Sequence, residues 1–504
     1  MNINLLQLGI FIGLTALVAL FTYIKCRNVP RDPSDSRDYF LAGGTLSWVF
    51  VAGSIMLTNI SAEQIVGMNG AQTLLVAWWE IAAALGLLIL AHWLIPMYYR
   101  YRCTTTTELL EHRFRDPHIR AMVSVLFMFG YMFILLPVVL YTGALFMQSM
   151  FHVNFFGDTQ MLNAAAEGMS CVAADDSFAC IPQSSQRLTT LVIAALFAVV
   201  GSLYAIFGGL RAIAISDTFN GIGLLVMGTL VSLLAMETIG WNFEGIPAER
   251  LTLIGSDQSD IPWHTLFTGM IFIQIFYWGT NMVITQRALA AKNVREAQKG
   301  LYAAVAMKLL IPLIVVLPGI AAYKLYGDIG DKAYGVIVAE VLPPWLSGAF
   351  AAVMAGAVLS TFNSCLNSAS ALYTLDVHQK YFNAKVCVKA MGQRVALIFA
   401  VVSVLLVPIY QNADSIIALL QKLNGLYSMP VMAAFLVAML FDNVRGLAVR
   451  IGLVSGVITY AVFTFVWSPL HYIHLMFITL VVAVAVTLIV NRLLPGDTAL
   501  AEAA

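Results

Sequence analysis

Apolar stretches long enough to cross a membrane recur along the whole chain. A helix needs about 20 mostly apolar residues to span the hydrocarbon core of a bilayer. Thirteen stretches meet this need: 4–24, 47–69, 74–99, 121–149, 188–207, 213–236, 264–285, 301–323, 346–375, 393–410, 415–440, 447–468 and 471–491. The pattern predicts an all-α integral membrane protein with about 13 transmembrane helices.

Two of these stretches carry polar residues in their middle, near the centre of the membrane. The second contains the run 58–64, TNISAEQ, and the seventh contains Gln274 and the run 277–281, YWGTN. The two stretches lie five apart along the chain. Helices that break at corresponding positions of two halves are typical of inverted-repeat transporters, which bind their solute at the bilayer midplane. The alternative is a pair of polar helix faces buried in a bundle.

The order of the stretches predicts one polytopic membrane domain over residues 1–504, since no segment has the composition of a soluble domain. We assign its parts as follows: 1–46 to an extra N-terminal helix and loop, 47–236 to the first repeat, 264–440 to the second repeat, and 441–504 to two C-terminal helices and a tail. The longest outer loops are then 150–187 and 237–263.

The basic residues predict the orientation. With the N-terminus outside, 21 of the 27 Lys and Arg residues fall in inner loops, Arg120 and Arg287 among them, and four fall outside. Lys308 and Lys422 lie within apolar stretches. Because basic loops are retained on the cytoplasmic side, we expect the N-terminus outside and the C-terminus in the cytoplasm. The compact loops favour a bacterial inner membrane.

The outer loop 150–187 contains Cys171 and Cys180. An oxidising exterior permits a disulfide between them. Two unpaired thiols are the alternative, and the sequence does not decide between these states.

Composition excludes several classes of protein. The chain is 60% hydrophobic and 11% charged, whereas soluble domains carry about 25% charged residues. Its net charge of zero gives no basic surface for a nucleic acid. The sequence shows no Walker-type loop, metal-ligand cluster or nucleophile elbow. We therefore expect a transporter in contact with membrane lipid, and not an enzyme or an ATP-driven pump.

Charged and amide side chains within the apolar stretches are candidates for solute binding. Glu80 and Lys308 each cost at least about 2.5–3.5 kcal/mol at the membrane centre, so such residues face a cavity or each other. A purely structural ion pair between them is the alternative. Gln64, Gln274 and Gln421 lie at comparable depth. Each amide offers an acceptor and two donors, the mixture that a polyhydroxylated solute needs.

Two aromatic residues follow Gln274 in the seventh stretch. Tyr277 and Trp278 could cover the apolar face of a sugar. Packing in the core of the bundle is the commoner reason for aromatic residues at such positions.

Hydroxyl groups in the ninth stretch suggest a cation site. Sodium is a hard cation that prefers oxygen ligands, which Ser360, Thr361 and carbonyls freed by unwinding of the second stretch would supply. Small polar residues also serve as ordinary helix-packing contacts in membranes. Asp217, near the inner end of the sixth stretch, could stabilise a nearby cation, or it could cap a helix or pair with a cytoplasmic arginine.

Five short motifs carry a family resemblance: DYFLAG at 38–43, NISAEQ at 59–64, QRALAAK at 286–292, EAQKG at 296–300 and LNS at 366–368. Through them the chain resembles the sodium/solute symporter family from about residue 38 to about residue 440, and most closely its sodium/glucose and sodium/galactose branch. The resemblance implies a LeuT-type fold of five plus five helices in inverted repeats.

The resemblance also implies roles for individual residues. The sugar-contacting positions of the family fall on Gln64, Glu80, Gln274, Lys308 and Gln421, and Tyr277 is similar to the aromatic residue that gates the sugar from inside. The implied sodium site comprises the carbonyls of Leu57, Ile60 and Ala357, the hydroxyls of Ser360 and Thr361, and the neighbouring Asp217. Ala83 and Gln274 stand where the bacterial galactose carrier has a serine and an asparagine, which puts the particular sugar in doubt.

Residues and resemblance together predict a sodium-coupled symporter that imports a small neutral sugar, similar to galactose or glucose, by alternating access. The alternatives are a sodium symporter for a carboxylate, amino acid or vitamin, and a sensor or channel that uses the same fold without coupled transport. The sequence leaves open the identity of the solute, the stoichiometry, the choice between sodium and protons, and the oligomeric state.

Overall fold

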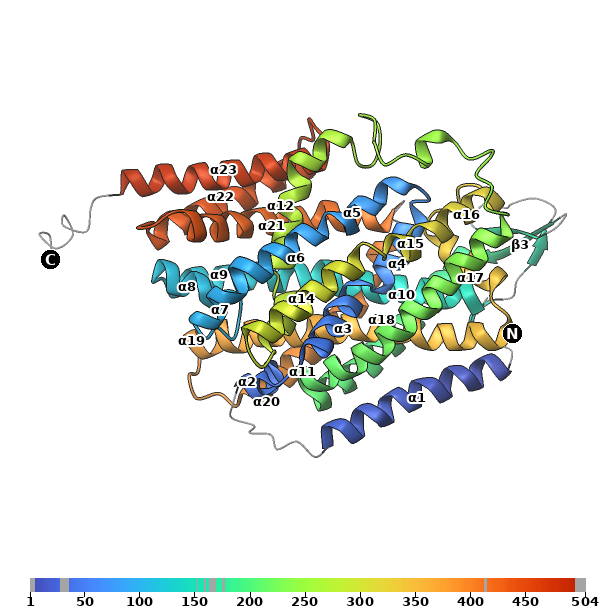
Figure 1. Cartoon of the computed structure of the whole chain (residues 1–504), viewed down its shortest axis with the longest axis horizontal. Coiled ribbons are helices and arrows are strands. Elements are labelled where there is room, and N and C mark those ends of the chain that lie inside the picture. Colours follow the sequence, from blue (N-terminus) through green and yellow to red (C-terminus); the bar gives the residue numbers. More distant parts are fainter. Residues whose placement is uncertain are drawn as a thin grey trace, which may run out of the picture.

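The computed structural model describes residues 5–27, 36–151, 153–157, 160–162, 169–174, 177–411 and 415–494. Figure 1 shows most of its helices lying side by side along the long axis of the molecule. The helices of the first half are α1 (Leu5–Arg27), α2 (Ser36–Phe40), α3 (Trp48–Asn59), α4 (Ala62–Gly70), α5 (Trp78–Ile81), α6 (Ala83–Ile89), α7 (Ile95–Arg100), α8 (Glu108–Phe114), α9 (Pro117–Gly130), α10 (Leu136–Phe151) and α11 (Gln183–Thr238). Those of the second half are α12 (Gly269–Ile275), α13 (Met282–Leu289), α14 (Val294–Lys308), α15 (Pro312–Val315), α16 (Leu317–Tyr326), α17 (Ala333–Val341), α18 (Pro344–Ala371), α19 (Gln379–Tyr381), α20 (Val388–Tyr410), α21 (Ile416–Leu440), α22 (Gly446–Phe465) and α23 (Tyr472–Leu493).

Short 3-10 and π-helical segments join or extend these helices. They are η1 (Ala42–Gly44), η2 (Leu74–Ala77), η3 (Leu90–Leu94), η4 (Tyr131–Leu135), η5 (Ala248–Arg250), η6 (Trp263–Phe267), η7 (Phe276–Thr280), η8 (Gly330–Lys332) and η9 (Leu372–His378). Of these, η3, η4, η7 and η9 are π-helical turns inside or beside longer helices. Such turns are frequent at functional sites.

Twelve of the thirteen predicted spans correspond to helices, or to bent helix pairs, that are long and apolar enough to cross a membrane. The bent pairs are α3 with α4, at 47°, and α14 with α15–α16, at 45°. The predicted stretch 264–285 is not among them, because it divides into α12, η7 and α13. The predicted all-α membrane architecture is confirmed, and this divided stretch is one of the two in which we expected a break.

Both breaks lie at the polar runs that predicted them. In the first, Ile60 (φ −77°, ψ 68°) leaves the helical region and Ser61 is extended, so α3 ends and α4 begins within two residues. In the second, Asn281 is extended between η7 and α13, and its side chain accepts the N–H of Val283 at 3.1 Å. Tyr131 donates to the same side-chain oxygen at 2.6 Å. At the second break the freed N–H of Val283 therefore finds a side-chain partner inside the protein, as a membrane interior requires.

The predicted spans 188–207 and 213–236 are two helices that share the label α11 and meet at Gly209, where the backbone leaves the helical conformation. Gly209 has φ 62° and ψ −175°, a conformation that is essentially restricted to glycine. A single residue thus replaces the loop that the sequence suggests between these two spans.

One element was not predicted. Strands β1 (Gln160–Leu162), β2 (Met169–Ala174) and β3 (Ser177–Pro182) form an antiparallel sheet in the order β1-β3-β2. Cys171 stands opposite Cys180 in the register of β2 and β3, but the two side chains lie outside what the structure describes. In Figure 1 the strands lie at the end of the molecule where α1 begins, opposite the end where α23 finishes.

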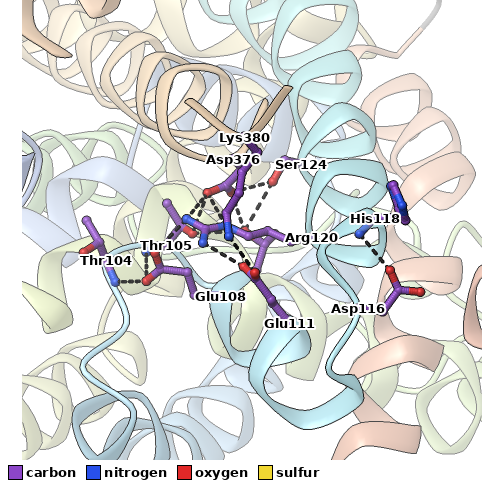
Figure 2. Close-up of polar contacts among 11 residues, drawn as sticks. Thr104, Thr105, Glu108, Glu111, Asp116, His118, Arg120, Ser124, Asp376 and Lys380 are labelled. Atoms are coloured by element: carbon purple, nitrogen blue, oxygen red, sulfur yellow. Dashed lines mark hydrogen bonds and ion pairs between the residues drawn. The ribbon is translucent and has the colours of Figure 1, made fainter. Parts of the chain in front are cut away.

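A cluster of charges at the end opposite the strands joins α8, α9 and η9 (Figure 2). The Arg120 guanidinium is 7% exposed and lies 2.5 Å from the fully buried carboxylate of Asp376. It also pairs with Glu108 at 2.6 Å and with Glu111 at 2.9 Å. Arg120 is therefore inside the helix assembly, which corrects its placement in an inner loop. Asp376 further accepts hydrogen bonds from hydroxyl groups of Thr105, Thr107 and Ser124.

Glu111 extends this cluster to Lys380, which donates to it at 2.6 Å. Burial alone would raise the pKa of Glu111, but the bonds from Lys380 and Arg120 outweigh burial and lower this pKa below its ordinary value. The cluster thus holds the connection between α7 and α9 against η9, the continuation of α18.

Removal of the carboxylate charge of Asp376 tests whether the cluster holds this connection in place. Asp376→Asn should leave Arg120 buried with less compensating charge and reduce the free energy of unfolding by about 3 kcal/mol. The measurement is detergent-induced unfolding followed by tryptophan fluorescence. The matched control is Asp442→Asn, which breaks an ion pair to Arg113 whose carboxylate is 85% exposed, and we expect it to cost about 1 kcal/mol or less. Equal losses in the two variants would contradict the role given to Asp376.

Candidate functional site

A small cavity lies in the middle of the helix assembly, beside both breaks. It has a volume of about 40 Å³ and is bounded by the end of α3 together with α4, α5, α12, η4, η7, α21 and neighbouring residues. Its polar lining comprises Asn59, Glu63, Gln64, Glu80, Gln274, Tyr277, Gln421, Asn424 and Tyr427. This volume holds about three water molecules, so the site has to widen to admit a larger solute.

Glu80 is the centre of the polar contacts in this cavity. Its carboxylate forms an ion pair with Lys308, and both side chains are at most 1% exposed. Gln64 donates to the other oxygen of Glu80 at 2.5 Å. Lys308 also donates to the side chain of Asn59, and its ammonium lies 4.5 Å from the centroid of the Trp278 ring. Lys308 is not among the residues that line the cavity, so it acts on the site through Glu80 and Asn59.

The two other predicted amides line the same cavity from other helices. Gln274, on α12, donates to the carbonyl of Trp79 at 3.0 Å and accepts from the indole N–H of Trp278 at 2.9 Å. Gln421 lines the cavity from α21, and the half-buried Tyr277 lines it from η7. Five of the six predicted solute-contacting residues therefore share one cavity, and the sixth lies directly behind it.

The predicted sodium ligands lie where α3, α11 and α18 meet. Thr361, on α18, donates to the carbonyl of Thr58 at 3.2 Å, next to the end of α3. Ser54, on α3, donates to Asp217 of α11 at 2.7 Å. Ser360 lies near Asp217, and in the described residues Ser360 Oγ and Asp217 Oδ1 have no hydrogen-bond partner of good geometry.

The backbone at this place also offers oxygen atoms. The last carbonyls of a helix lack intrahelical partners, and α3 ends two residues after Leu57, with Ile60 in the break itself. Ala357 lies one turn before Thr361 on α18. Within the described ranges no group of three His, Cys, Asp or Glu residues could hold a metal ion. A cation bound here would therefore be held by hydroxyls and carbonyls, a donor set that suits sodium and not a transition metal.

Arg287 was not predicted as part of the site. The charge pattern predicts it in an inner loop, but it is fully buried in α13. Its guanidinium donates to Ser54 at 3.2 Å and to Ser364 of α18, and so it links the two helices that carry the predicted sodium ligands. Arg287 belongs to the motif QRALAAK at 286–292, which carries part of the family resemblance and could have marked it as a site residue. The count of basic residues by itself placed Arg287 in a loop.

Comparison with known proteins identifies the family of the chain. The model of the sodium:solute symporter family matches residues 39–165 and 186–456. The chain belongs to this family. Sodium is therefore its coupling ion, and its relatives are transporters and not enzymes.

Two relatives and one solved structure illustrate the match. The uncharacterized symporter YidK of Escherichia coli is 34% identical over 98% of this chain and 85% of its own length. The sodium/glucose cotransporter of Vibrio parahaemolyticus is 28% identical over 90% of this chain and 84% of its own length. The structure of a Na+-coupled sialic acid symporter is 17% identical and has a TM-score of 0.78 over 97% of this chain and 98% of its own. The predicted LeuT-type fold is confirmed.

The ion pair of the symporter's cavity can be tested by a double-mutant cycle. Lys308→Met should leave Glu80 buried without its cation and reduce the free energy of unfolding by about 3–5 kcal/mol. The double variant Glu80→Gln/Lys308→Met should recover most of this loss, because no charge is then left unpaired. The measurement is the detergent-induced unfolding midpoint of each variant. Additive losses would contradict direct pairing in the folded protein.

Proposed function

We propose that this symporter imports a small, neutral, polyhydroxylated solute, similar to galactose or glucose, together with sodium. The observation that carries the proposal is the cavity that gathers Gln64, Glu80, Gln274 and Gln421 beside the break between α3 and α4. Each solute hydroxyl taken out of water without a partner costs about 1–3 kcal/mol. Amides provide both donors and acceptors and can partner several hydroxyls at once.

Aromatic residues complete a site suited to a sugar. Tyr277 and Trp278 lie beside the amides, and the half-buried Tyr277 lines the cavity directly. We propose that Tyr277 covers the apolar face of the sugar and gates it from inside. The name of the Vibrio relative supports glucose-like solutes, whereas the sialic acid symporter, at 17% identity, supports the fold alone.

For sodium we propose the carbonyls of Leu57, Ile60 and Ala357 and the hydroxyls of Ser360 and Thr361, with Asp217 beside them. The orphaned oxygen atoms of Ser360 and Asp217 and the bond from Thr361 to α3 support this assignment. A cation here would hold the end of α3 against α18 and so stabilise the break between α3 and α4. Gln64 lies four residues after Ile60, and the stabilised break would place its side chain where it can bind the sugar. Ion and sugar would therefore bind cooperatively.

Transport would follow by alternating access, in which one group of helices rocks against the other. We propose that residues 47–236 and 264–440 are the two repeats, with the N-terminus outside and the C-terminus in the cytoplasm of a bacterium. One sodium ion that moves inward through 100 mV releases about 2.3 kcal/mol. That energy supports about 45-fold accumulation of a neutral sugar, so one ion for each sugar is sufficient.

Uptake by proteoliposomes tests the proposal. Purified protein should accumulate labelled galactose or glucose when an inward sodium gradient is imposed and should not do so when choline replaces sodium. Gln64→Ala and Thr361→Ala should each reduce uptake at least about tenfold, since each removes an interaction worth more than about 1.4 kcal/mol. Gln64→Ala should raise the KM for sugar, whereas Thr361→Ala should mainly raise the sodium concentration needed for half-maximal uptake.

The matched control is Thr15→Ala, a change in α1 at a hydroxyl that donates to the carbonyl of Phe11 in the same helix; its uptake should equal that of the wild type. Equilibration of sugar without sodium, or no sugar uptake at all, would contradict the proposal.

A further inference from the structure

A second carboxylate, Glu63, lines the cavity and has no established role. It lies in the first turn of α4 and is 4% exposed. Within the described part of the chain its Oε2 atom accepts no hydrogen bond. Glu80 differs in this respect, because Lys308 and Gln64 occupy both of its oxygen atoms.

An orphaned carboxylate oxygen in a protein interior needs an explanation. Nearly all buried polar atoms have partners, and the exceptions indicate strain, function, or a bound water or ion. The cavity next to Glu63 is large enough for water molecules. In a transporter, a bound solute displaces such water and then has to supply the hydrogen-bond donor itself. A hydroxyl or an ammonium group can do so, whereas a solute carboxylate cannot.

The charge balance of the cavity points in the same direction. Glu63 and Glu80 are the charged residues in its lining, and the buried ion pair with Lys308 compensates only Glu80. An ionised Glu63 therefore gives the described lining one negative charge in excess. A solute carboxylate would meet this charge in a medium of low dielectric constant, where repulsion is far stronger than in water. Bound sodium adds the same positive charge for every solute and does not change the order of preference.

We propose that Glu63 contacts the solute and sets its charge class. Its free oxygen accepts hydrogen bonds from solute hydroxyl or ammonium groups, and its charge excludes solutes that carry a carboxylate. This inference rests on the proposed function, and it narrows the solute to neutral or amine-bearing polyhydroxylated compounds. It also separates this site from one that accepts acidic sugars.

Competition among three hexoses of one stereochemistry tests the inference. Galactose, galactosamine and galacturonate are neutral, cationic and anionic at neutral pH, and each is measured as a competitor of sodium-driven uptake of labelled galactose. Wild-type protein should accept galactosamine at least as well as galactose and should bind galacturonate at least about tenfold more weakly. In Glu63→Gln, which keeps the shape of the side chain, the discrimination against galacturonate should shrink about tenfold, and galactosamine should lose its advantage.

The matched control is Glu340→Gln, the same chemical change at an exposed position of α17, which should preserve the wild-type order. If Glu63→Gln takes up galactose and preserves that order, the role of Glu63 is overturned while the proposed function stands. The order in which the three hexoses compete for uptake by wild-type protein is itself a test that needs no variant. If galacturonate competes as well as galactose does, the inference is overturned. A wild-type protein without sodium-driven galactose uptake would instead refute the proposed function, and the inference with it.

Discussion

The break in the backbone between α3 and α4 is the constraint on which the rest of the site depends. A chain that leaves the helical conformation inside a membrane exposes carbonyl and N–H groups that lipid cannot satisfy. The protein meets this demand with partners from distant helices, such as the hydroxyl of Thr361 on the carbonyl of Thr58. The same unsatisfied oxygen atoms attract a cation. Ion binding and structural stability at this position therefore have one physical origin.

The charged groups around the break follow from the same constraint. The charge of Glu80 is tolerated at this depth because Lys308 neutralises it. Asp217 accepts a hydrogen bond from Ser54, and Ser54 in turn accepts one from Arg287. Both compensating cations, Lys308 and Arg287, come from the second half of the chain. The polar centre therefore binds the two halves together, while the surrounding apolar helices only exclude water.

The fold was largely predictable, because apolar length and polar interruption act within one helix and are visible in a short window of sequence. The breaks at Ile60 and Asn281 were predicted on that basis. Features that depend on contacts between helices were not predictable from the residues alone. Arg287 was counted in a loop, since a count of charges cannot show which arginine has buried partners. The position of Lys308 behind Glu80 and the strands of the 160–182 segment likewise depend on long-range pairing.

The charge cluster around Arg120 has a consequence for how the molecule moves. Its ion pairs attach α8 to α9 and to η9. A rotation of α7 relative to α8 and α9 would change the backbone of the short segment 101–104, where Arg102 adopts a left-handed conformation (φ 53°). A pair of spectroscopic labels, one on each side of the segment 101–104, would report the amplitude of that rotation.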